Sequence, residues 1–228
     1  MSADSGLPTY RGVGGLYEGV STDEGLEIEE VLSGAMIRAR PELTWKYILQ
    51  VEEACRGAEP NPGHGVIARL GKERDEVVVL TQNVDGLHRE AGSDGLIEIH
   101  GNLHELHCIR CPWEEHVADY TGLRLPPKCP ECGELVRPRV VLFGEALPAR
   151  AVAQLEVQMR RGFSLVIVVG TSASFPYIAA PVQLARSWGA RTVEINPGTS
   201  TVSGMMDLRL PARAAPTLDA LAAALGYG

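Results

Sequence analysis

The sequence is poor in aromatic residues and has no long apolar run. Phe, Trp and Tyr make up 5% of its 228 residues, although 45% are hydrophobic and 22% charged, as in an ordinary folded protein. No apolar stretch approaches the roughly 20 residues that a helix needs to cross a bilayer. Residues 1–11 lack the basic and apolar regions of a secretory signal. We therefore expect a cytoplasmic protein with no membrane partner.

Positive charge is also scarce. The chain carries 21 Lys and Arg against 29 Asp and Glu, which gives a formal net charge of −8. Proteins that bind nucleic acid through its phosphates normally present an excess of basic side chains. We therefore expect no direct contact with nucleic acid, whereas an acidic surface can still act on basic protein tails.

Five cysteines are present, and four of them form two Cys-x-x-Cys pairs separated by 17 residues. The four are Cys108, Cys111, Cys129 and Cys132. Each pair offers two thiolates from one tight turn, and two such turns complete a tetrahedral zinc site. Four thiolates leave no open position, so the zinc should be structural, and His104 and His107 are not needed as ligands. Two disulfides are the less favoured alternative.

Three short β-branched runs predict buried parallel strands, and small or polar residues follow each run. The runs are 77–80, 165–169 and 192–195. Helical patterns are found at 149–161, at about 179–188 and at 217–225. This alternation predicts an α/β fold with a doubly wound parallel sheet, whose ligand would lie at the carboxyl ends of the strands.

Two segments interrupt the alternation. Residues 16–60 are helical and rather charged, with helices expected over 27–37 and 43–55, and residues 108–138 are rich in Cys and Pro. We expect three parts: a sheet domain made of 1–15, 61–107 and 139–228, a helical module at 16–60, and a zinc ribbon at 108–138.

Polar side chains follow the first predicted strand. Asn83 and Asp85 would place an amide and a carboxylate in one crevice, although an Asx turn that reverses the chain is the simpler local explanation. His100 closes an apolar stretch, where a lone histidine is usually structural; its ordinary pKa near neutrality nevertheless suits a general base. The segment 2–12 would suit a loop over an anionic cofactor, or equally a disordered leader.

Taken together and in this order, these segments resemble the sirtuin (Sir2) family of NAD-dependent protein deacylases. The similarity runs from SADSGLPTYRG through TQNVDGLH, IHGN, the two Cys-x-x-Cys pairs, RPRVVLFGEALP and GTS to INPG. It implies a Rossmann-like NAD-binding domain with a small inserted domain made of a zinc ribbon and a helical module. The two segments that interrupt the alternation agree with this.

The resemblance also implies an activity and a site. NAD and one structural Zn2+ would be bound, and the acyl group of an acyl-lysine protein or peptide would pass to ADP-ribose with release of nicotinamide. His100 would be the general base, with Asn83 and Asp85 as further catalytic residues. Residues expected to bind NAD are Ser2, Ala3, Tyr10, Arg11, Gln82, Asn83, Asp85, Gly170, Thr171, Ser172, Asn196, Pro197, Gly198 and Ala214. Those expected to bind the substrate, partly by pairing with it as an added strand, are Val141, Phe143, Gly144 and Glu145.

The sequence departs from the family pattern at three places. Residues 34–40 contain Arg38 and Arg40 but no tyrosine three positions before either, so we expect uncharged acyl groups. After the Gly-Thr-Ser loop, Pro176 comes one position earlier than is usual in the family. The sequence starts within the family's Gly-Ala-Gly-x-Ser motif, so we expect a central strand and its glycine loop to be absent and NAD binding to be weak.

Two alternatives stay open. A mono-ADP-ribosyltransferase or NAD glycohydrolase would use the same nicotinamide-cleaving pocket with another nucleophile. A catalytically silent zinc-ribbon interaction protein is the second, although His100 together with Asn83 and Asp85 argues for an enzyme.

Overall fold

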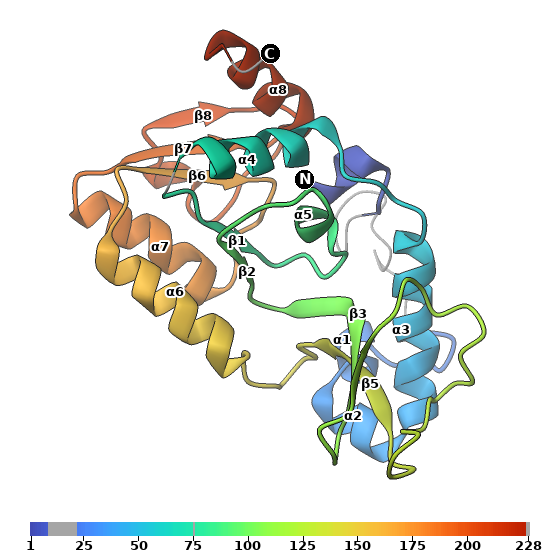
Figure 1. Ribbon diagram of the computed structural model, residues 1–228. Coiled ribbons are helices and arrows are strands. Elements are labelled where there is room, and N and C mark those ends of the chain that lie inside the picture. The colour runs from blue at the N-terminus through green and yellow to red at the C-terminus, as the bar shows by residue number, and fades with distance from the viewer. Residues whose placement is uncertain (9–21, 75, 227–228) are drawn as a thin grey trace.

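The computed structural model describes residues 1–8, 22–74 and 76–226 (Figure 1). Two parallel sheets make up the larger part. Their strands are β1 (Val79–Thr81), β2 (Leu96–Glu98), β6 (Leu165–Val169), β7 (Arg191–Ile195) and β8 (Leu208–Leu210). One sheet has the order β1-β2 and the other β6-β7-β8. The three β-branched runs thus form parallel strands, as predicted.

Helices cover both faces of these strands (Figure 1). They are α4 (Pro62–Glu73), α6 (Ala149–Arg161), α7 (Pro176–Ser187) and α8 (Ala214–Ala224), with the short α5 (Leu87–Glu90) and the 3-10 turns at Ser2–Ser5 and Ser203–Met205. Val66 of α4 and Leu218 of α8 pack on Ile195 on one face, whereas Val182 of α7 packs on Val168 on the other. This is the doubly wound α/β arrangement that the alternation predicts. No helix in the described part of the chain is long and apolar enough to span a membrane.

The two parallel sheets are not joined to each other. Among the described residues β1 pairs only with β2 and β6 only with β7, and both strands line a cavity of about 2310 Å³. Leu165 and Ile167, expected to be buried, are 47% and 41% exposed. Their side chains are more exposed than predicted because they line this cavity instead of packing under a helix.

The smaller part combines three helices with an antiparallel sheet of order β4-β3-β5. The elements are α1 (Ile28–Val31), α2 (Gly34–Ala39), α3 (Pro41–Cys55), β3 (Gly101–Cys108), β4 (Glu114–His116) and β5 (Val136–Val140). Trp45 of α3 is fully buried, packs in one core with Leu106 and Val136, and donates from Nε1 to the Val136 carbonyl at 3.1 Å. The helical segment and the ribbon therefore share one core. The boundaries expected for the three parts, at 16–60, 108–138 and the remainder, stay a prediction.

One expected helix is broken. Residues 27–37 form two helices, because the Ser33 side chain caps α2 by accepting from the Met36 N–H at 3.0 Å. The next residue, Gly34, donates from its N–H to the Phe143 carbonyl, so the break holds this module to a distant loop. That contact joins residues far apart in sequence, which the helical pattern could not reveal.

Candidate active site

The cavity runs along β1 and β6 and includes their carboxyl ends, where ligands of such sheets bind. Its lining includes residues 82–85 after β1, His100 after β2, residues 170–172 after β6, and Ser2 and Ala3 of the N-terminal turn. Segments from four parts of the chain thus meet at one edge of the sheets, and most of them were predicted as site residues.

Ser2 bridges the two polar side chains that follow β1. Asn83 donates from Nδ2 to Ser2 Oγ at 2.7 Å, and the Ser2 hydroxyl donates to Asp85 Oδ2 at 2.5 Å. The other carboxylate oxygen of Asp85 accepts from the Leu87 N–H at 3.0 Å, which closes an Asx turn. The amide and the carboxylate therefore lie in the same crevice, as predicted, and the turn coexists with that arrangement.

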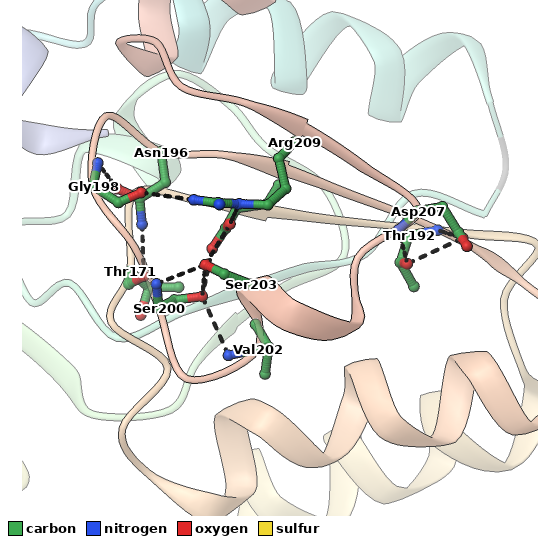
Figure 2. A network of polar contacts seen from close by, with 10 residues as sticks. Thr171, Thr192, Asn196, Gly198, Ser200, Val202, Ser203, Asp207 and Arg209 are labelled. Carbon is green, nitrogen blue, oxygen red and sulfur yellow. Dashed lines mark hydrogen bonds and ion pairs between the residues drawn. The ribbon is translucent and has the colours of Figure 1, made fainter.

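Thr171 connects the loops that follow three strands. Gln82 donates from Nε2 to Thr171 Oγ1 at 3.0 Å, after β1. Asn196, after β7, donates from Nδ2 to the Thr171 carbonyl at 2.9 Å (Figure 2). Asn196 Oδ1 in turn accepts from the Gly198 N–H at 3.0 Å. A continuous polar chain therefore runs from Gln82, in the cavity, to the loop at 196–198.

A buried carboxylate holds that loop. Glu194 is 1% exposed; it accepts from the hydroxyls of Ser200 and Ser203 and from Arg209 Nε at 2.7 Å. Arg209 also donates to the Gly198 carbonyl at 3.1 Å (Figure 2). Burial alone would raise the pKa of the Glu194 carboxyl, but the serine hydroxyls and Arg209 outweigh it and hold the pKa below its ordinary value.

His100 is held at both ring nitrogens. Nδ1 lies 3.2 Å from the Gln82 carbonyl oxygen and Nε2 lies 2.7 Å from the Tyr177 hydroxyl. The Phe175 ring stacks on Tyr177 at 5.3 Å and meets His100 edge-on at 5.9 Å. Burial lowers the pKa of His100, and the Gln82 carbonyl opposes that effect. The imidazole is therefore neutral at pH 7 and can accept a proton.

The four residues expected to contact the substrate, Val141, Phe143, Gly144 and Glu145, all line the cavity. Three of them have structural partners, and the first, Val141, donates from its N–H to the His100 carbonyl at 2.9 Å. The Phe143 N–H donates to the Leu32 carbonyl and its carbonyl accepts from the Gly34 N–H, both at 2.9 Å. The Glu145 carboxylate pairs with the guanidinium of Arg137 at 2.7 and 2.9 Å. The backbone N–H and carbonyl of Phe143 therefore already have hydrogen-bond partners within the molecule. That these four residues contact the substrate stays a prediction.

The four thiols of the ribbon form one cluster. The sulfurs of Cys108, Cys111, Cys129 and Cys132 all lie within 4.8 Å of one another. Sγ of Cys108 and Cys132 are 3.5 Å apart, those of Cys111 and Cys129 are 3.4 Å apart, and no disulfide links them. A zinc ion with Zn–S bonds of about 2.3 Å needs sulfurs about 3.8 Å apart. The donor set and spacing therefore fit one tetrahedral zinc.

Not every predicted site residue reaches the cavity. Asn196, Pro197, Gly198 and Ala214 are not among the residues that line it, and Tyr10 and Arg11 fall outside the described residues. Conversely, Tyr177, which contacts His100, is not among the residues predicted for the site. The signal in the sequence was the pair of aromatic residues that flank Pro176, shortly after the Gly-Thr-Ser loop.

Comparison with known proteins places this arrangement in one family. The model of the Sir2 family matches residues 1–176. A protein of Pseudomonas aeruginosa named NAD-dependent protein deacylase 2 is 51% identical over 217 residues, covering 94% of this chain and 84% of that protein. An NAD-dependent protein deacylase of Thermococcus sibiricus is 36% identical, covering 97% and 86%.

Solved structures agree. A Sir2 homologue in complex with NAD has a TM-score of 0.86 at 31% identity, covering 99% of this chain and 85% of the other. A Sir2 complex with a p53 peptide and NAD has a TM-score of 0.84 at 28% identity, covering 100% and 90%. Because the family model spans most of the sequence and relatives of this identity cover nearly all of it, the chain belongs to the Sir2 family.

Proposed function

We propose that this protein is an NAD-dependent protein-lysine deacylase, which transfers the acyl group of an acyl-lysine to ADP-ribose and releases nicotinamide. Two relatives named as NAD-dependent protein deacylases support the activity. The observation that carries it is the meeting of Asn83, Asp85 and His100 in one cavity at the carboxyl ends of the strands.

The residues at these strand ends fit NAD. Gly170 has φ +56°, a left-handed conformation that residues with a side chain rarely adopt, and a Cβ there would lie 3.1 Å from the Met1 amino nitrogen. We infer that residues 170–172 and Asn196 bind the ADP-ribose part, and that Gln82, Asn83 and Asp85 bind the nicotinamide and its ribose. Bound NAD would supply an ADP-ribosyl group with nicotinamide as its leaving group.

The protein's own residues supply the remaining chemistry. His100 is neutral at pH 7 because burial lowers its pKa, so Nε2 would be able to accept a proton from a ribose hydroxyl of bound NAD. Asn83 and Asp85 would orient the nicotinamide end. The cavity walls at Val141 and Phe143 would hold the acyl chain and exclude water, which would otherwise consume NAD.

The substrate would be an acyl-lysine in a protein or peptide with an uncharged acyl group. Residues 34–40 offer no tyrosine three positions before Arg38 or Arg40. The p53 peptide bound by a solved Sir2 structure supports a peptide ligand. The four-cysteine cluster would hold one structural zinc ion with no coordination position left for catalysis.

Mass spectrometry of a reaction with NAD and an acetyl-lysine peptide tests the proposal. Deacetylated peptide, nicotinamide and O-acetyl-ADP-ribose should appear in equal amounts. Free ADP-ribose with unchanged peptide would instead identify an NAD glycohydrolase, and ADP-ribose attached to protein would identify a transferase of that group. No consumption of NAD at any acyl length would contradict the proposal.

A further inference from the structure

Tyr177 contacts the atom of His100 that the proposed function uses. Its hydroxyl lies 2.7 Å from Nε2, and the Gln82 carbonyl lies 3.2 Å from Nδ1. A carbonyl can only accept, so Nδ1 carries the ring proton and Nε2 carries the lone pair. Burial raises the pKa of Tyr177, so the phenol is neutral and donates to Nε2.

The fold holds Tyr177 in this place. Pro176 begins α7, which presets the backbone of the first turn, and Tyr177 is the second residue of the helix. The ring of Phe175 stacks on Tyr177 with an interplanar angle of 13°. The imidazole of His100 is thus held between Gln82, after β1, and the first turn of α7, after β6.

The geometry points to Tyr177 as a positioning residue for His100: the Tyr177 hydroxyl, opposite the Gln82 carbonyl, holds the imidazole in one orientation with the lone pair of Nε2 toward Tyr177. The inference rests on the proposed function, because it takes His100 as the base. The hydrogen bond is made to the neutral imidazole, so it favours the form that can accept a proton. When a substrate hydroxyl approaches, the hydrogen bond from the Tyr177 hydroxyl to Nε2 breaks. Nε2 then accepts the proton of the substrate hydroxyl.

The groups that face His100 are few. Gln82 faces it from the segment after β1, and Phe175 and Tyr177 face it from the start of α7. Burial, opposed by the Gln82 carbonyl, accounts for the lowered pKa, and no charged side chain of the described residues contributes. Removing the hydroxyl of Tyr177 therefore removes the hydrogen-bond donor to Nε2 without disturbing an ion pair of His100.

The substitution Tyr177→Phe tests the inference, since it keeps the ring and removes only the hydroxyl. NMR titration of the histidine nitrogens in the ligand-free protein should show a higher pKa for His100, because the donor that favours the neutral imidazole is lost. Acyl transfer at pH 6 should fall about threefold to tenfold, with little change at pH 8, while nicotinamide release is preserved. The matched control Tyr47→Phe removes a phenol hydroxyl that donates to Glu24 in the helical module, and should leave His100 unchanged.

An unchanged pKa of His100 in folded Tyr177→Phe would overturn the inference, because it would show that Tyr177 only packs. A second variant, Tyr177→3-fluorotyrosine, keeps the ring and strengthens the donor, so it should lower the pKa of His100; a rise would equally overturn it. The titration needs neither NAD nor peptide. Failure of the wild-type protein to deacylate would therefore contradict the proposed function and would be distinguishable from failure of the Tyr177 contact.

Discussion

Asp85 shows how one side chain can carry a structural and a functional contact together. Oδ1 accepts from the Leu87 N–H and closes the turn, while Oδ2 accepts from Ser2, which in turn accepts from Asn83. The Asx turn holds the Asp85 carboxylate in the crevice, so a structural role in the turn does not exclude a role in binding. His100 is similar, because a half-buried position at the end of a strand also makes it neutral at pH 7.

At this scale we predict that His100→Ala lowers acyl transfer by about 10² to 10⁴, the usual contribution of a positioned acid–base group. Nicotinamide release should fall less, because it precedes the removal of the proton. Single-turnover measurement of both products would show the difference. The control His116→Ala changes a histidine on β4 whose side chain is 64% exposed. Near-normal deacylation by His100→Ala would disprove its assignment as the base.

Single elements depend on contacts that only a few residues make. The loop after β7 is anchored by Glu194 within that strand and by Arg209 of β8, which also binds the Gly198 carbonyl. The ribbon depends on four thiols and on the core it shares with α3. Both elements should therefore respond to the loss of one polar group.

The first prediction for an element concerns Arg209→Met. The change leaves the buried Glu194 carboxylate without its cation and frees the loop that carries Asn196. Since Arg209 is 38% exposed, the cost in unfolding free energy is about 1–3 kcal/mol, below that of a fully buried pair. The dissociation constant for NAD should rise about threefold to tenfold with kcat nearly constant.

Calorimetric titration of NAD would measure this, with Arg150→Met, an exposed arginine on α6, as the control. An unchanged affinity for NAD in Arg209→Met would show that the loop does not contact the dinucleotide.

The second prediction for an element concerns the metal. Chelation, or Cys129→Ser, should unfold the ribbon and loosen α1 to α3 before the parallel sheets, because the free energy of metal binding stabilises a segment too small for a core of its own. Hydrogen exchange should show lost protection at 101–140 with protection kept at 165–195. Cys55→Ser, outside the cluster, is the control. Freshly purified protein without zinc, or full protection after chelation, would refute this.

The molecule as a whole buries titratable groups away from the cysteine cluster. His64 is fully buried, and its ring packs against that of His88 at 4.7 Å. Burial lowers the pKa of His64 to about 4 from an ordinary value of 6.5. His64 therefore binds a proton below about pH 6.5 in the unfolded chain, but only below about pH 4 in the folded protein. The free energy of unfolding should fall as the pH drops through this window, and its full value is present above it.

We predict that His64→Gln reduces this dependence on pH. His64 Nδ1 accepts from the Asn61 N–H at 3.2 Å in the capping box of α4, and glutamine can fill that position without titrating. The loss of unfolding free energy between pH 7 and pH 4.5 should shrink by about 2–3 kcal/mol in the variant. Urea unfolding at the two pH values measures this. His116→Gln on the surface should leave the dependence unchanged, and an equal dependence in His64→Gln would contradict the prediction.

Local patterns in the sequence were enough to predict much of this protein. The spacing of four cysteines predicted one cluster, the apolar period of 149–161 predicted α6 with its observed bounds, and three β-branched runs predicted parallel strands. Such patterns succeed because a knuckle, a helical face and a strand each depend on residues a few positions apart. The expectation that the ligand lies at the strand ends followed from fold class alone and stays a prediction.

The tertiary structure decided the rest, since these contacts join residues far apart in the chain. Three contacts span long sequence separations: the bridge from Ser2 to Asn83 and Asp85, the hydrogen bond from Gly34 to Phe143, and the hydroxyl of Tyr177 on His100. The exposure of β6 likewise depends on which strand lies beside it. No local period contains that information, because packing between elements sets the distance, the orientation and the partner of each side chain.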